Sequence, residues 1–123
     1  MANELSYQFQ MLLKNGSLQD QYASSQLAAT QNSALLIRNV TNVTTAAGGQ
    51  LLDVGDVVTP GFAIFSNLDD TDFVEIGIIV SGTFYPFLKL LPGEQQLARL
   101  SNIAPYARAD TSTVDLFYII YSD

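Results

Sequence analysis

The chain has 123 residues, enough for one domain to bury an adequate core, and its 48% hydrophobic content is typical of a globular protein. It contains no cysteine and no histidine, which excludes disulfides, thiolate metal sites and the commonest general base, so we predict no enzyme, no catalytic residue and no cofactor. Twelve acidic residues against five scattered bases give a formal charge of −7, which disfavours direct contact with nucleic acid.

Neither a membrane nor a secretory route is indicated by the apolar segments. No apolar run approaches the roughly 20 residues that a membrane helix requires. The first ten residues, MANELSYQFQ, lack a basic segment followed by an apolar one, so we expect no cleaved signal peptide.

The N-terminal third predicts a hairpin. Apolar and polar residues alternate between Glu4 and Lys14, a period of two that is typical of a half-buried strand. Asn15-Gly16 predicts a type I′ turn, and the more polar residues 17–23 predict a returning edge strand. Residues 24–33 are rich in Ser, Gln, Ala and Thr without a clear period, and they form either a short helix or a loop.

The middle of the chain contains one strand and a long connection. Residues 34–45, ALLIRNVTNVTT, have the β-branched and apolar content of a strand. The AAGG segment that follows is a flexible break. Residues 50–61, QLLDVGDVVTPG, predict an irregular connection with room for one helical turn.

Five further strands are predicted in the second half. They are GFAIFSN (61–67), DFVEIGIIV (72–80), TFYPFLKL (83–90), EQQLARL (94–100) and TVDLFYIIY (113–121). Residues 102–112 are interpreted as a connection. Gly77, in the middle of a strand, indicates a bulge or a close backbone approach, and Pro86 indicates an edge strand or a bulge.

Short strands separated by frequent turns predict an all-β fold. The pattern favours an antiparallel β-sandwich of about eight strands, jelly-roll-like in topology. No repeat or linker divides the sequence, so we predict a single domain over residues 1–123, with an N-terminal arm around Met1 to Leu13.

An acidic cluster is the strongest candidate for a binding site. Asp69, Asp70, Asp72 and Glu75 lack the glycine and the ligand spacing of an EF-hand, although other calcium geometries remain open for a loop of a β-sandwich. Asn and Asp residues also turn the chain and cap its backbone groups. We therefore interpret the segment from Asn67 as a corner between strands and predict no metal site.

Carbohydrate chemistry has little support in the sequence. Asp72 and Glu75 differ in parity along a strand, so they would point to opposite faces and could not act as a glycosidase pair. The tyrosines leave a weak carbohydrate-binding surface open, although core or interface positions are the simpler interpretation for most of them. These tyrosines are Tyr7, Tyr22, Tyr85, Tyr106, Tyr118 and Tyr121.

The predicted strands contain more aromatic residues than one inner face requires. The surplus indicates either contacts between subunits or strands that loops cover on their second face. The candidate interface residues are Phe62, Phe65, Phe84, Tyr85, Phe87, Phe117 and Tyr118.

Three segments in succession resemble small virion proteins of tailed bacteriophages. They are DVGDVVTPGFAIFSNLDDTDFVEIGI, GTFYPFLKLLPGEQQLARL and PYARADTSTVDLFYIIYSD. Shared features include the Asn-Leu-Asp corner, Val-Glu-Ile-Gly and Pro-Gly-Glu, in the same order. The resemblance covers roughly the last 75 residues, and it extends to small jelly-roll cement proteins.

The resemblance implies a function in the virus particle. It implies a capsid decoration protein on the exterior of the head, made in the host cytoplasm, which binds the major capsid protein as a homo-oligomer, a dimer or a trimer. A tail, neck or fibre component is the first alternative. A calcium-dependent carbohydrate-binding module is the second.

Overall fold

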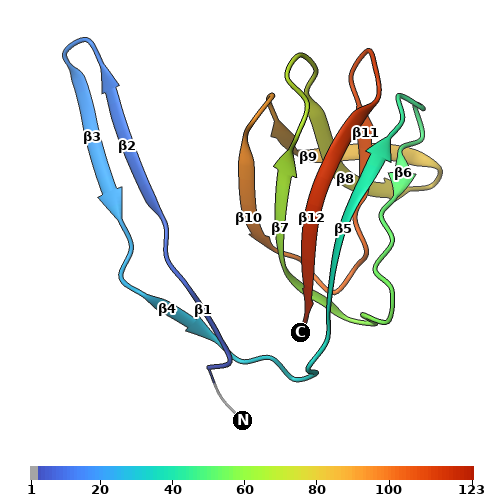
Figure 1. Cartoon of the computed structure of the whole chain (residues 1–123), viewed down its shortest axis with the longest axis horizontal. Coiled ribbons are helices and arrows are strands. Elements are labelled where there is room, and N and C mark those ends of the chain that lie inside the picture. The colour runs from blue at the N-terminus through green and yellow to red at the C-terminus, as the bar shows by residue number, and fades with distance from the viewer. Residues whose placement is uncertain (1–2) are drawn as a thin grey trace. The chain divides into compact units, whose positions relative to one another are not determined.

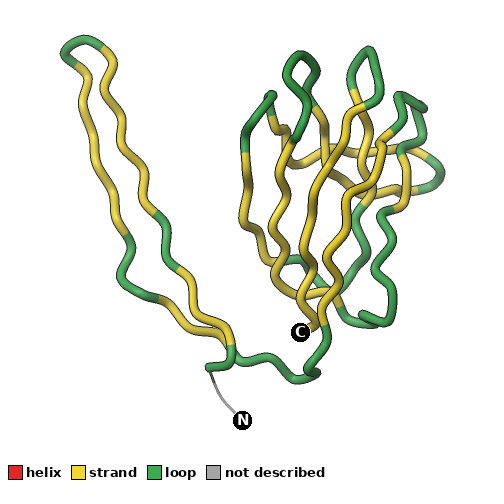
Figure 2. Tube along the Cα trace, in the orientation of Figure 1, coloured by secondary structure: helices red, strands yellow, loops and turns green. Residues whose placement is uncertain are grey.

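Two units make up the chain in the computed structural model, which describes residues 3–123 (Figure 1). The first unit ends at Ser33, and the second extends from Ala34 to Asp123. All the regular secondary structure of the described residues is β-strand, as Figure 2 shows, so the predicted all-β fold class is confirmed. Met1 and Ala2, where the predicted arm begins, lie outside the described residues.

The first unit is a two-stranded antiparallel ribbon in which β2 pairs with β3 and β1 pairs with β4. Its strands are β1 (Leu5–Tyr7), β2 (Gln10–Asn15), β3 (Leu18–Ala23) and β4 (Leu27–Ala29). The predicted hairpin is confirmed, but its turn lies one residue later. Asn15 pairs with Leu18, so Gly16 and Ser17 form the loop, and Gly16 has a φ of 61°. A glycine with positive φ at the first loop position is typical of a type II′ turn, not type I′.

Two other predictions for this unit were wrong. Every residue of β2 is exposed, because a two-stranded ribbon has no second layer of its own to cover it. Residues 24–33 form neither a helix nor only a loop, since they contain β4. Pairing with β1 stabilises this strand despite its two alanines, which shows how pairing overrides low strand propensity.

The second unit is an antiparallel β-sandwich of two four-stranded sheets. One sheet has the order β10-β7-β12-β5, and the other has the order β6-β11-β8-β9. The strands are β5 (Leu36–Val43), β6 (Gln50–Leu51), β7 (Pro60–Asn67), β8 (Val74–Val80), β9 (Thr83–Leu90), β10 (Gln95–Arg99), β11 (Tyr106–Ala109) and β12 (Val114–Ser122). The predicted β-sandwich is confirmed, although two of the strands predicted for it belong to the ribbon.

The sandwich contains two strands that the sequence did not predict. Residues 102–112 were interpreted as a connection, but they contain β11, which lies between β6 and β8. Ala107 and Ala109 face the core, and such small side chains give only a weak hydrophobic alternation. The short β6 lies in the predicted connection of residues 50–61, where no helical turn forms.

Pairs of strands that are distant in sequence follow one order through the sandwich. β5 pairs with β12, β6 with β11, β7 with β10, and β8 with β9. The first four strands of the unit are therefore matched with the last four in reverse order.

The core lies between the two sheets and contains residues from both. Phe65 and Tyr118 come from one sheet, and Ile76, Leu90 and Ala107 come from the other. The register of β8 and β9 shifts between Ile76 and Gly77, so the bulge predicted at Gly77 is confirmed. Its strand partner Pro86 lies in the edge strand β9, also as predicted.

Candidate functional site

The acidic segment forms a corner that is held by its own side chains. Asn67 is buried, and its Oδ1 accepts a hydrogen bond of 2.8 Å from the backbone N–H of Asp69. Asp69 Oδ2 accepts hydrogen bonds from the backbone N–H groups of Thr71, at 3.0 Å, and Asp72, at 2.7 Å. Asn67 and Asp69 thus cap the backbone as predicted for a turn.

Two further acids of this segment, Asp72 and Glu75, bind other protein groups, and Asp70 is exposed. Asp72 Oδ1 accepts a hydrogen bond of 2.8 Å from the Thr111 hydroxyl. Glu75 forms an ion pair of 2.9 Å with Arg108. Among residues 3–123, no group of three or more acidic side chains is arranged to hold a metal ion. The corner interpretation therefore accounts for the contacts that these acids make.

Asp69 should make the stability of the corner depend on pH. The backbone N–H groups of Asp72 and Thr71 hold the pKa of the Asp69 carboxyl below its ordinary value of 3.8. A lowered pKa in the folded state gives stability that is complete above the ordinary value and is lost as the pH falls through the lowered one. We expect urea unfolding to show wild type more stable than Asp69→Ala at neutral pH, with the difference disappearing in acid.

Asp69→Asn is the control for this prediction, because its amide oxygen accepts hydrogen bonds but does not titrate. Its advantage over Asp69→Ala should persist in acid. A difference between wild type and Asp69→Ala that stayed constant down to strongly acidic pH would contradict the role assigned to the carboxylate.

Two of the candidate interface residues are core residues instead. Phe65 and Tyr118 are fully buried between the sheets, so neither is available to a partner. The Tyr118 hydroxyl donates a hydrogen bond of 2.7 Å to the carbonyl of Asp53 and accepts one of 3.1 Å from Asn39 Nδ2. Burial raises the pKa of Tyr118 above its ordinary value of 10.0. These hydrogen bonds explain how a tyrosine is accommodated in the core.

Phe84 also lies against the protein itself, although it belongs to neither core face. The guanidinium of Arg108 lies 4.6 Å from the centre of its ring. A Cβ at Gly49 would lie 2.8 Å from a carbon of the ring, so the loop before β6 also packs against it. Phe84 is therefore buried by a cation and a loop, as the alternative of loop-covered strands predicted.

Tyr85 and Phe87 are the two candidates that are largely exposed, at 54% and 53%. Phe87 borders a hollow of about 280 Å³ beside β9. Ile78, Leu100, Ile103 and Pro105 line the rest of it, together with Arg99 and Ser101.

Phe62 and Phe117 point away from the core on the sheet β10-β7-β12-β5. Successive residues of a strand point to opposite faces. Ala63, Leu116 and Tyr118 belong to the core. Their neighbours Phe62 and Phe117 must therefore lie on the outer face of this sheet.

The sheet β10-β7-β12-β5 (Figure 1) has apolar residues on the outer face of each of its four strands. The register places Ile119 between Ile64 and Arg38, and Ile64 next to Leu97. Phe117 pairs in the same way with Val40. We call this surface the outer patch; it consists of Leu36, Val40, Phe62, Ile64, Leu97, Phe117, Ile119 and Tyr121.

Exposure varies across the outer patch, and charged groups lie at its borders. Leu36 and Val40, on the edge strand β5, are 55% and 54% exposed, and Phe117 is half-buried. Phe62 and Ile119 are buried, and the guanidinium of Arg99 lies 4.9 Å from the centre of the Phe62 ring. Arg38 and Arg99, two of the chain's five bases, lie on the same face. Asp115 lies on this face as well, paired with Asn42, and Asp123 forms an ion pair of 2.6 Å with Arg99. The apolar residues between these charges are typical of a protein-binding surface.

The six tyrosines do not gather into one surface. Tyr7 and Tyr22 belong to the ribbon, Tyr85 and Tyr106 to one sheet of the sandwich, Tyr118 to the core and Tyr121 to the outer patch. The geometry therefore gives no support to a carbohydrate surface built from all of them.

Comparison of the chain with protein-family models, curated proteins and solved structures finds no match. No helix long and apolar enough to cross a membrane occurs in residues 3–123.

Proposed function

We propose that the chain is a bacteriophage capsid decoration protein that binds the outside of the head lattice as an oligomer and stabilises it. The observation that carries this proposal is the outer patch, an apolar sheet face bordered by Arg38 and Arg99. Its partner is the major capsid protein. The resemblance of residues 53–123 to small virion proteins supports the same function.

The topology of the sandwich also supports the proposal. Matched pairing of the first four strands with the last four, in reverse order, is what a long folded-over hairpin produces. We infer that the sandwich is a jelly roll, the architecture shared by many capsid proteins.

The proposed mechanism relies on many modest contacts. An oligomer that binds several sites of a lattice gains effective concentration for each further contact without any new chemistry. A protein that binds only the assembled lattice stabilises that state by mass action. The particle then resists heat and internal pressure better when the protein is bound.

A charge placed in the outer patch should weaken attachment to the particle. We expect Val40→Lys to reduce binding about tenfold or more, since burial of a charge at an apolar contact is unfavourable. Val58→Lys is the matched control, because Val58 is 86% exposed in the loop before β7. Co-sedimentation of each variant with particles that lack the protein measures the effect.

Microscopy and heat resistance of the particles test the proposal as a whole. Electron microscopy of particles with labelled protein should show density over the whole head, and loss of the protein should lower the temperature at which heads release DNA. Density on the tail or at a single vertex would instead assign it to the tail, neck or fibre. Equal heat resistance with and without the protein would contradict a stabilising role.

A further inference from the structure

The ribbon of the first unit has an apolar face of its own, separate from the outer patch of the sandwich. Met11 pairs with Tyr22, and Leu13 pairs with Asp20. Paired residues of an antiparallel ribbon point to the same face. Near the base, the rings of Phe9 and Tyr22 stack with centres 5.8 Å apart. The apolar ribbon face therefore consists of Phe9, Met11, Leu13, Leu18 and Tyr22.

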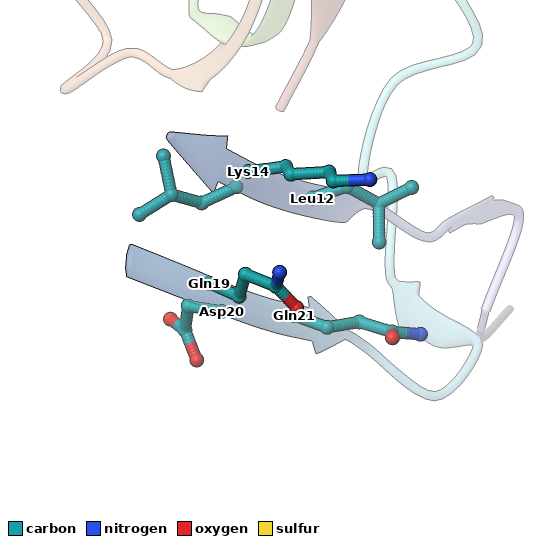
Figure 3. Close-up of a pocket in the computed structure, with 6 residues that line it drawn as sticks. Leu12, Lys14, Gln19, Asp20 and Gln21 are labelled. Atoms are coloured by element: carbon teal, nitrogen blue, oxygen red, sulfur yellow. The ribbon is translucent and has the colours of Figure 1, made fainter. Parts of the chain in front are cut away.

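The opposite face of the ribbon is polar except for Leu12 and Ala23. Gln10, Leu12 and Lys14 alternate with the apolar residues of β2, and Gln19 and Gln21 are paired opposite them. In Figure 3 the side chain of Asp20 leaves β3 in the direction opposite to that of Gln19. The two faces of this ribbon thus differ strongly in polarity.

The apolar ribbon face needs a covering layer. Each of its five side chains is between 41% and 69% exposed. An isolated two-stranded hairpin is marginally stable in water and usually requires packing against a further layer. Five large side chains that are about half exposed present on the order of 500 Å² of apolar surface, close to the largest patches on soluble monomers.

Surface area and charge both favour a second copy of the ribbon as that layer. Two such faces packed together would bury on the order of 1,000 Å², about the minimum for a specific protein interface. Residues 34–123 hold ten of the twelve acids and four of the five bases, so that part carries a charge of −6. The first 33 residues carry only −1, with Glu4, Lys14 and Asp20. Contact between copies is therefore least opposed by repulsion at the ribbons.

We propose that two copies of this chain associate by packing their apolar ribbon faces against each other. The contact is isologous, because each copy contributes the same surface. A two-fold axis at the level of Leu12 sets the Leu13 and Asp20 pair of one copy opposite the Met11 and Tyr22 pair of the other. The carboxylate of Asp20, the one charged group on this face of the ribbon, then lies level with a tyrosine hydroxyl that can donate to it.

Two leucines on opposite faces of β2 provide the decisive test. Leu13→Asp places a charge in the proposed contact. Leu12→Asp places the same charge on the opposite, polar face of the ribbon. We expect Leu13→Asp to raise the dimer dissociation constant about a hundredfold or more, because the position is buried twice per dimer. Leu12→Asp should change it less than about threefold. Sedimentation equilibrium of the full-length chain measures both.

Cysteine cross-linking provides a second readout that tolerates small changes in stability. The chain has no cysteine, so any thiol cross-link must come from the introduced residue. Met11→Cys should give a covalent dimer with a short bismaleimide cross-linker, because its thiols lie between two faces packed about 10 Å apart. Leu12→Cys should remain monomeric under the same treatment, because its thiols lie on the outsides of the two packed ribbons. Circular dichroism should show an unchanged sandwich in all four variants.

Several outcomes would overturn the proposal. Among them are a wild-type chain that is monomeric at every concentration, a dimer that Leu13→Asp leaves intact, and equal effects at positions 12 and 13. A monomer that binds phosphatidylcholine vesicles through the ribbon would assign the face to lipid instead. This dimer would supply the oligomer on which the proposed function relies. Because sedimentation and cross-linking use no particles, a chain that fails to dimerise can be distinguished from a dimer that fails to bind the capsid.

Discussion

Replacing Asn67 by Leu should lower the free energy of unfolding by about 4 kcal/mol, although the two side chains have similar volumes. The Asn67 side chain is 1% exposed. Its Nδ2 donates hydrogen bonds of 3.0 Å to the carbonyls of Asp72 and Leu90, and its Oδ1 accepts one from the Asp69 N–H. Leucine would leave these three peptide groups without their partner, at about 1 to 3 kcal/mol for each one that stays buried.

The loss should be cooperative because Asn67 joins three segments. Its side chain connects the corner to the end of β9, and its backbone carbonyl accepts a hydrogen bond of 3.1 Å from Gly93. Urea unfolding followed by circular dichroism should show a lower midpoint with an unchanged slope.

Asp70→Ala is the control for this prediction, since Asp70 is exposed in the same corner. A change within about 0.5 kcal/mol is expected for it. If Asn67→Leu proved equally mild, the hydrogen bonds of Asn67 would not be what holds the corner.

Local turn chemistry was the part of this fold that could be predicted from sequence. Capping by Asn67 and Asp69 involves groups within five residues, so residue type and spacing are sufficient to expect it. The hydrogen bond from Asn67 to Leu90 spans 23 residues, and no local pattern indicates it. The sequence therefore predicted a corner but not its dependence on β9.

The difference between local and long-range interactions also explains which positions of the aromatic residues could be predicted. The run from Leu116 to Tyr121 is apolar at both parities, so the sequence indicated that both faces of β12 are covered or in contact. Whether the odd-numbered or the even-numbered residues of β12 face the core depends on how the opposite sheet packs. Tyr118 faces inward with Leu116 and Ile120, and the carbonyl of Asp53, 65 residues away, accepts a hydrogen bond from its hydroxyl. Phe117 consequently faces outward and becomes part of the outer patch.

The two unpredicted strands of the sandwich have physical explanations of their own. β11 presents Ala107 and Ala109 to the core, and two alanines change the local hydrophobicity too little to mark a strand. β6 has two residues and is fixed by its pairing with β11. Both strands form because of distant partners, which a single sequence does not reveal.

Replacing Gly77 by Ala should be the other strongly destabilising change, lowering the free energy of unfolding by about 3 kcal/mol or more. A Cβ at this position would collide with the carbonyl oxygen of Tyr85 and would lie 2.7 Å from the Cα of Pro86. Both atoms belong to the backbone of β9, so no side-chain rotation relieves the clash. The strands β8 and β9 would have to move apart, which weakens the pairing on both sides of the bulge.

Gly48→Ala is the matched control, because a Cβ there meets no atom within 4 Å and the residue does not have a positive φ. We expect it to change stability by less than about 0.5 kcal/mol. Hydrogen exchange can locate the damage of Gly77→Ala, which should appear as lost protection in β8 and β9 before other strands. The bulge leaves Phe87 as the extra residue of β9, next to the hollow it lines, so separation of these strands should also enlarge that hollow. Equal stability of the two alanine variants would show that β9 adapts freely, and the bulge could then not be what positions Phe87.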